Sequence, residues 1–196
     1  MRLILTAAVA GLAIAAAGCR GSSDNAANAS NDMMMNEAMA NDMNMPSDMN
    51  MAVAPMLASD FVSTVAGSDM YEIESGKLAQ TMAGNAELKA FGGMLVTDHG
   101  KSSADLKTAA SEASPPVTPP ATMPAGLRAK LDALKAAKGA EFDKLFVEQQ
   151  KEGHQKALDA LKSYASSGDQ QSLTAFASKA VPVVQGHLDK LNAMKL

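Results

Sequence analysis

Apolar residues recur every three or four positions from residue 57 onward, which is the period of an amphipathic α-helix. No stretch alternates between apolar and polar residues for long enough to predict a β-strand. Helix-ending signals divide this region at Gly84, at the proline-rich run 114–120 and at Gly168. The pattern therefore predicts long helices over about 59–82, 85–113, 139–166 and 169–194, with a short helix over 125–138. Ser59, Asn85 and Asp169 are the expected N-caps.

Four long helices joined mostly by short links predict an all-α, four-helix bundle over residues 57–196. The single long connection lies between the second and third long helices, where ferritin-like bundles also have theirs. Pro182 should kink the last helix. The expected core consists of Phe61, Val65, Leu88, Phe91, Leu95, Leu106, Phe146, Leu158, Leu161, Leu173, Phe176, Val184 and Leu191.

The N-terminus has the pattern of an export signal. Met1 and Arg2 precede an apolar run of about 15 residues, which is too short to span a membrane stably. The run ends in small residues before Cys19 and resembles the lipobox of bacterial lipoproteins. This resemblance implies a signal peptide over 1–18 and a lipid anchor on Cys19 that attaches the chain to a membrane. Arg20, where Asp would resemble an inner-membrane signal, favours the outer membrane. The alternative is an ordinary secretory signal with an incidental cysteine.

Residues 19–56 are rich in Met, Asn and Asp and have no helical or strand period. Such a composition predicts a disordered tether. Its methionines allow two interpretations. Thioethers are soft ligands for Cu(I), so the methionines could bind copper. Alternatively, they belong to an imperfect repeat in a tether and have no ligand role. The methionines concerned are Met33, Met34, Met35, Met39, Met43, Met45, Met49 and Met51.

Composition excludes several classes of function. A net charge of −4, no Trp and few other aromatic residues argue against binding to nucleic acid. One cysteine excludes a disulfide framework, a thiolate zinc site and an iron–sulfur cluster within one chain. No serine-nucleophile motif, phosphate-binding glycine loop or redox dithiol is present, so an enzyme is the least favoured class.

Ionisable residues interrupt the apolar faces of the predicted helices. His99, His154 and His187 each lie three, four or seven residues from core positions, so each returns to the inward face. Glu72 follows Phe61 and Val65 on the inward face of the first helix, and Asp98 lies at the edge of the second. All five are close enough to mid-helix to share one layer of the bundle.

Buried charges must bond one another, bind a cation or reach solvent. The first alternative is a transition-metal site of carboxylates and imidazoles for iron, zinc, manganese or copper, formed by Glu72, Asp98, His99, His154 and His187. The second is a polar network that fixes the register of the helices, or histidines bonded separately to main-chain carbonyls. The di-iron signature, Glu three residues before His, is absent because Val96 and Lys151 occupy those positions.

Several of these residues together resemble one family. The chain resembles the family called domain of unknown function 4142 at a set of residues spread over the predicted helices. These residues are Phe91, Met94, Asp98-His99, Phe142-Asp143, His154-Gln155, Phe176-Ala177, Pro182 and His187-Leu188. The resemblance covers about residues 57–194. It implies a ferritin-like bundle that bacteria export, often as a lipoprotein, and it implies no particular activity.

The family's histidines correspond to His99, His154 and His187. The chain departs from the pattern at Gly153, where an acidic residue is common, at Phe146, where Tyr is common, and at Val181, where Leu is common. The first hypothesis is therefore a non-catalytic, lipid-anchored envelope protein that binds a partner, or a second copy of itself, or supports stress tolerance. The alternative is a periplasmic metal-binding module.

Overall fold

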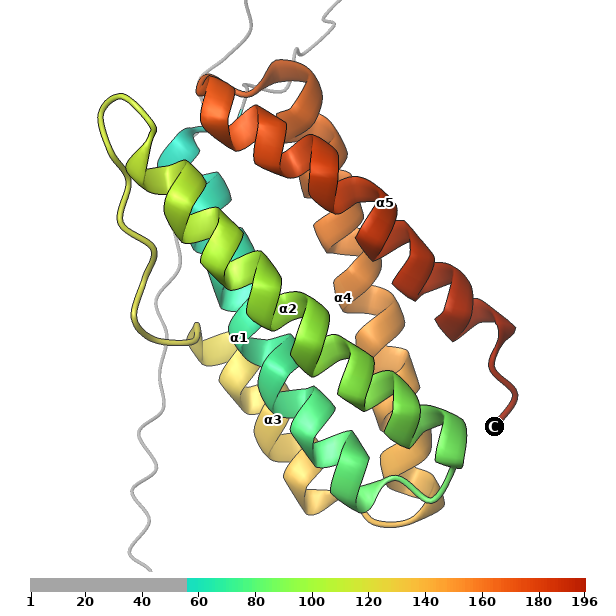
Figure 1. The fold of residues 1–196 in the computed structure, drawn as a ribbon. Helices are drawn as coiled ribbons and strands as arrows, with labels where there is room; N and C mark the ends of the chain where they lie inside the picture. The colour runs from blue at the N-terminus through green and yellow to red at the C-terminus, as the bar shows by residue number, and fades with distance from the viewer. Residues whose placement is uncertain (1–55) are drawn as a thin grey trace, which may run out of the picture. The chain divides into compact units, whose positions relative to one another are not determined.

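The computed structural model describes residues 56–196. The predictions for Cys19, the signal peptide and the methionines of the tether lie outside this range. The described residues form five helices and no strand (Figure 1), which confirms the all-α prediction. The helices are α1 (Ala58–Met82), α2 (Ala86–Ser111), α3 (Ala125–Ala136), α4 (Ala140–Ser167) and α5 (Gln171–Ala193).

The four long helices form the predicted bundle, and they associate as two hairpins. α1 packs most extensively against α2, and α4 packs most extensively against α5. A long connection links the first hairpin to the second along the chain. It returns along the bundle from the end of α2 and includes the short helix α3 beside α1 (Figure 1). None of the described helices combines the length and the apolarity that a membrane span requires.

One of the three predicted N-caps is confirmed. The side chain of Asn85 accepts a hydrogen bond from the backbone N–H of Glu87 at 2.7 Å, which satisfies a free donor at the start of α2. The prediction for Ser59 was wrong, because α1 already begins after Leu57. Asp169 does not cap α5 either. Its carboxylate accepts a hydrogen bond from the Tyr164 hydroxyl at 2.6 Å, and α5 begins one residue later, after Gln170.

Close packing of α1 against α2 depends on two glycines. A Cβ atom added to Gly76 would lie 2.7 Å from the carbonyl oxygen of Gly92, and one added to Gly92 would lie 2.6 Å from that of Gly76. Real Cβ atoms do not approach this closely, so any side chain at either position would push the helices apart. The first hairpin is therefore held at a backbone separation that only glycine permits.

Two apolar clusters form the core and leave a polar layer between them. In one cluster Phe61 stacks on Tyr164, with ring centroids 4.0 Å apart, and in the other Phe91 meets Phe146 edge-on. All the expected core residues are buried except Val65, which is half-buried. Along α2 the second cluster ends at Leu95 and the first begins at Leu106. The polar layer lies at this level.

Candidate metal centre

Three histidines from three helices meet in the polar layer. His99 of α2, His154 of α4 and His187 of α5 are all buried, with exposed fractions of 6%, 2% and 3%. Their ring centroids are 5.3–5.8 Å apart. One ring nitrogen from each lies within 4.8 Å of one from each of the others. The structure thus brings together all three histidines that the sequence placed on inward faces.

His99 is oriented by a carboxylate from the neighbouring helix. Its Nδ1 lies 2.7 Å from Oδ1 of Asp69 on α1, and the other oxygen of Asp69 accepts a hydrogen bond from the Ser103 hydroxyl at 3.3 Å. Nε2 of His99 is buried and has no hydrogen-bond partner. Sequence reasoning missed Asp69, although its position eight residues after Phe61 and three before Glu72 places it on the inward face of α1.

His154 is oriented by its own helix. Its Nδ1 lies 2.9 Å from the main-chain carbonyl oxygen of Gln150, one turn earlier in α4. Because a carbonyl only accepts, Nδ1 carries the hydrogen. The other ring nitrogen, Nε2, lies 3.2 Å from Nδ1 of His187. The proton on Nδ1 therefore leaves the lone pair of Nε2 directed at the neighbouring imidazole.

His187 is held from the opposite side by Asp98. Its Nε2 lies 2.9 Å from Oδ2 of Asp98, which projects from α2 and has a side chain 38% exposed. Sequence reasoning placed Asp98 among the metal ligands. In the structure Asp98 contacts the ring nitrogen of His187 that faces away from His154, so it positions an imidazole at the edge of the layer.

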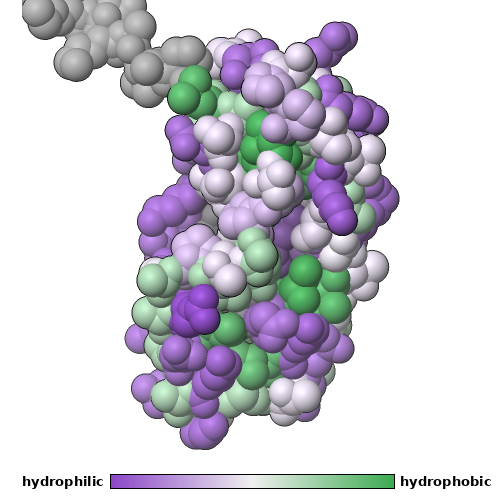
Figure 2. Space-filling model, turned by 90° about the vertical axis from the view of Figure 1, so that its left-hand side faces the viewer, coloured by the Kyte–Doolittle hydropathy of each residue, from purple (hydrophilic) through white to green (hydrophobic). Residues whose placement is uncertain are grey.

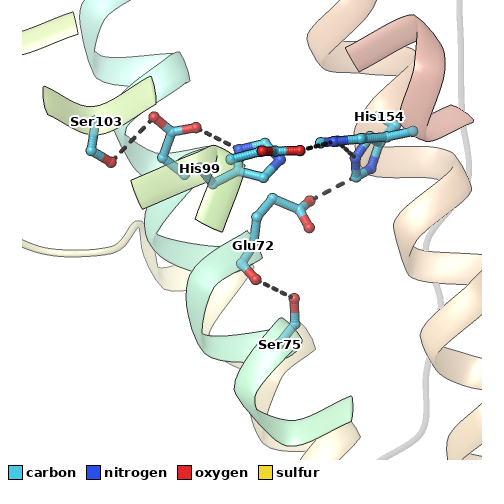
Figure 3. Close-up of polar contacts among 8 residues, drawn as sticks. Glu72, Ser75, His99, Ser103 and His154 are labelled. Carbon is cyan, nitrogen blue, oxygen red and sulfur yellow. Dashed lines mark hydrogen bonds and ion pairs between the residues drawn. The ribbon is translucent and has the colours of Figure 1, made fainter. Parts of the chain in front are cut away.

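Glu72 lies beside the three imidazoles without joining them. Its carboxylate is directed at His154 (Figure 3), with Oε1 3.9 Å from Nδ1, and Oε2 is buried without a hydrogen-bond partner. Burial raises the pKa of Glu72 to about 7, because a charged carboxylate is poorly solvated there. Nearby, Gln150 donates to the Ser75 hydroxyl at 3.0 Å and leaves its own Oε1 unpaired.

The three imidazoles differ in their affinity for protons. Burial lowers the pKa of His154 to about 3, and repulsion from His99 and His187 adds to this. Burial also lowers the pKa of His187, although Asp98 opposes it. For His99 burial again acts to lower the pKa, but the hydrogen bond to Asp69 and the surrounding carboxylates outweigh it and raise the pKa above the usual value. Two of the three rings are therefore neutral at pH 7.

The hydrogen bonds determine which lone pairs remain free. Tautomers follow from the partner of each ring nitrogen, and carboxylates and carbonyls require an N–H opposite them. Hydrogens therefore lie on Nδ1 of His99, on Nδ1 of His154 and on Nε2 of His187. The nitrogens with free lone pairs are then Nε2 of His99, Nε2 of His154 and Nδ1 of His187. In neutral rings the lone pairs of His154 Nε2 and His187 Nδ1 face each other across 3.2 Å. Such an arrangement is repulsive until a proton or a metal cation lies between them.

These contacts combine both alternatives that the sequence left open. The network of hydrogen bonds is extensive, yet it leaves His99 Nε2 and Glu72 Oε2 without partners in a buried layer. A network that served only to fix helix register would be expected to satisfy its buried polar atoms. The unpaired atoms fit the chemistry of a cation site, in which each imidazole uses one nitrogen for the metal and the other for an orienting partner.

Comparisons with known proteins agree with this fold. The sequence matches the family described as Domain of unknown function (DUF4142) over residues 28–194. No curated protein is significantly similar in sequence. Two similar solved structures are CopM in the Cu(I)-bound form, with 17% identity and a TM-score of 0.58, and CopM in the Cu(II)-bound form, with 19% identity and a TM-score of 0.57. Each covers 70% of this chain and 94% of the CopM chain. The likeness to CopM shows a shared fold, and the family match confirms that this chain belongs to the DUF4142 family.

Proposed function

We propose that this protein is an exported, non-catalytic metal-binding protein that holds one copper ion inside its bundle through His99, His154 and His187. The observation that carries the proposal is the convergence of three imidazole nitrogens within 4.8 Å in a buried layer. The second nitrogen of each ring is held by Asp69, the Gln150 carbonyl or Asp98, respectively. Partners of this kind fix the tautomer and direction of metal-binding histidines.

The charges around the three rings favour a cation. Asp69 and Asp98 each contact one imidazole, and the carboxylate of Glu72 lies beside His154. Binding a divalent ion to neutral nitrogens in a buried layer requires negative charge nearby. A cation would also favour ionisation of Glu72, whose pKa of about 7 places it close to half-ionised at neutral pH. The carboxylates thus supply compensation without being ligands themselves.

Copper is the preferred metal for two reasons. Imidazole nitrogen is a good ligand for copper and zinc, and copper forms the tighter complexes of the two. The solved structures with a similar fold are copper-bound forms of CopM. The Met-rich segment, with Met33, Met34, Met35, Met43, Met45, Met49 and Met51, adds soft thioether ligands suited to Cu(I). We therefore infer that the segment and the bundle handle the same element.

The N-terminal sequence supports a location in the cell envelope. The signal-like run and the lipobox-like residues before Cys19 support export and a lipid anchor at the periplasmic face of the outer membrane. Changing Cys19→Ser should abolish incorporation of labelled fatty acid and move the protein from the membrane fraction to the soluble fraction. Unchanged labelling and fractionation would show that Cys19 is not the anchor.

Metal analysis tests the bundle site directly. The full chain, purified without chelator and titrated with Cu(II), should bind one equivalent that is resistant to weak competitors. Changing His99, His154 and His187 together to Ala should remove that equivalent. A matched control changes Gln155→Ala and Gln185→Ala, since these residues neighbour His154 and His187 in sequence but bond only to Asp159 and Asp189, respectively.

Two results would contradict parts of the proposal. If the triple variant kept the full copper content, the histidines would be a structural network and the proposal would fail. If the wild-type chain bound zinc but not copper through the same residues, the site would stand and the choice of metal would be wrong. Because the triple variant removes three buried side chains, His154→Gln alone, with folding checked by circular dichroism, provides a milder second test.

A further inference from the structure

A large cleft runs into the bundle between its two hairpins. Its volume is about 990 Å³, and all five helices contribute to its walls. Figure 2 shows a face of the molecule on which the surface is hollowed near its middle. Sites for small organic ligands commonly have volumes of about 300–1,000 Å³, so the cleft is large enough for a molecule and not only for an ion with its waters.

The cleft reaches the three-histidine site. His99 and His187 form part of its wall, together with their partners Asp69 and Asp98. Gly153, which precedes His154, also lines it, and an added Cβ atom there would lie 3.4 Å from Oε1 of Glu72. No side chain from position 153 therefore stands between the cleft and the polar layer. An ion held by the histidines would be adjacent to the cleft through His99 and His187.

Three protein ligands leave a coordination position for a further molecule, as in metal sites with three histidines and one exchangeable ligand. The structure brings three ring nitrogens together, and Oε1 of Glu72 lies 3.9 Å from Nδ1 of His154, the nitrogen that is bonded to the Gln150 carbonyl and so is not one of the free three. Resting on the proposed copper site, we infer that the cleft binds a neutral, largely apolar small molecule with one nitrogen or sulfur donor. That donor would take the open position.

The walls of the cleft favour apolar contact. Small and aliphatic side chains form much of the surface around the histidines, and Phe176 adds an aromatic ring. An apolar group placed there would be removed from water, which favours binding of a ligand that carries an apolar ring. The apolar wall includes Val65, Leu127, Ala157, Ala160, Phe176 and Val184.

The charges of the cleft favour a neutral ligand. Four lysines line it, and four carboxylates besides Asp69 line it as well. Several of these are paired. Glu152 binds both Lys130 and Lys156 at 2.6 Å, and Lys101 binds Asp105. Because Asp69 is bonded to His99 and the other four carboxylates equal the four lysines in number, neither an anion nor a cation would gain a strong electrostatic advantage on entering. The four lysines are Lys101, Lys130, Lys156 and Lys179, and the carboxylates are Asp98, Asp105, Glu112 and Glu152.

Binding of probe ligands to the Cu(II)-loaded full chain tests this inference. Imidazole, 4-phenylimidazole and azide would each be titrated while the visible absorption of copper is recorded, and the copper content would be measured afterwards. We expect 4-phenylimidazole to shift the copper band and to bind at least about ten-fold more tightly than imidazole, because its ring contacts the apolar wall. Azide, which offers a nitrogen donor but no apolar group, should bind more weakly than 4-phenylimidazole.

A variant that fills part of the cleft beside Glu72 provides a second test of the inference. Gly153→Leu should retain one copper per chain and lose at least about ten-fold in affinity for 4-phenylimidazole, since the new side chain occupies the space beside Glu72. The matched control is Gly100→Leu in α2, where an added Cβ atom meets nothing within 4 Å. This control should bind both copper and the probe as the wild type does.

The possible failures are distinguishable. A chain that binds copper but shows no spectral change with any probe, or equal affinity for imidazole and 4-phenylimidazole, overturns the cleft inference and leaves the copper site intact. A chain that binds no copper in the bundle overturns the proposed function and this inference with it. Should Gly153→Leu fail to fold, the ratio of the two imidazole affinities in the wild type still decides the question.

Discussion

Asp69 on α1 holds Nδ1 of His99 on α2 at 2.7 Å, and both side chains are almost completely buried. The contact fixes which nitrogen of His99 carries hydrogen and leaves Nε2 directed into the polar layer without a partner. In the proposed copper site, Asp69 would therefore orient the imidazole for the cation. Its negative charge behind the ring would also make the free nitrogen a better donor to that ion.

Asp69→Asn is expected to weaken copper binding about 10- to 100-fold without abolishing it, the usual effect of removing a partner that orients a ligand. The amide keeps a similar shape but removes the charge. Affinity would be measured by competition with a chelator of known strength. Asp132→Asn, which changes an exposed acid, is the control and should leave the affinity unchanged. Equal affinities for wild type and Asp69→Asn would show that Asp69 has no influence on the site.

Glu72 should make the stability of the metal-free protein depend on pH. Burial raises its pKa from 4.5 to about 7, so the folded chain keeps a proton that the unfolded chain releases between those values. The stabilisation that this group contributes is therefore fully present below about pH 4.5 and is lost as the pH rises to about 7.

Glu72→Gln removes this dependence because the amide stays neutral. At pH 8, in the presence of chelator, the free energy of unfolding of the variant should exceed that of the wild type by roughly 3 kcal/mol. The difference should shrink as the pH falls toward 4.5. Urea denaturation at several pH values measures it. The histidines titrate in both proteins, so parallel curves would mean that Glu72 is not responsible.

Gly92→Val should destabilise the first hairpin strongly, because its Cβ atom would lie 2.6 Å from the carbonyl oxygen of Gly76. Separating two packed helices to admit a side chain costs about 1–3 kcal/mol or more. Gly100→Ala is the opposite case in the same helix, with open space around the added atom. It should stabilise the protein by roughly 0.5–1 kcal/mol, through helix propensity alone. Equal urea midpoints for the two variants would contradict the close approach of α1 and α2.

The Met-rich segment should bind Cu(I) independently of the bundle if its thioethers are ligands. Replacing its methionines by leucine keeps the hydrophobicity and removes the sulfur atoms. We expect this variant to lose Cu(I) equivalents and to keep the single Cu(II) equivalent that depends on His99, His154 and His187. Anaerobic titration with a Cu(I) indicator measures the first quantity. The same Cu(I) stoichiometry with and without the sulfur atoms would leave the segment as a tether only. The replaced residues are Met33, Met34, Met35, Met39, Met43, Met45, Met49 and Met51.

Much of the fold could be predicted from local signals. Helix ends followed from Asn85, from the proline-rich run and from Gly168, because these residues have strong backbone preferences. The predictions for Ser59 and Asp169 failed for different reasons. The turn before α1 needs no side-chain cap, and Asp169 found a partner in Tyr164 that is specified only by tertiary packing.

The histidines of the site were found from helical period, whereas their partners were not. Spacing showed that His99, His154 and His187 face inward, but it did not show which nitrogen each would present. That depends on Asp69 across the helix interface and on the Gln150 carbonyl, which is a main-chain atom and leaves no trace in the sequence. Asp98 was recognised at the edge of its helix face, yet only the structure places it behind His187.

The division of the bundle into two hairpins has a mechanical consequence. His99 belongs to the first hairpin, whereas His154 and His187 belong to the second. A copper ion bound by all three would be a cross-link between halves that otherwise meet through fewer contacts and are separated by an open cleft. Binding and release of the copper ion would then change amide hydrogen exchange in the helices that face each other across the two hairpins. Exchange there should be slowest in the copper-bound protein.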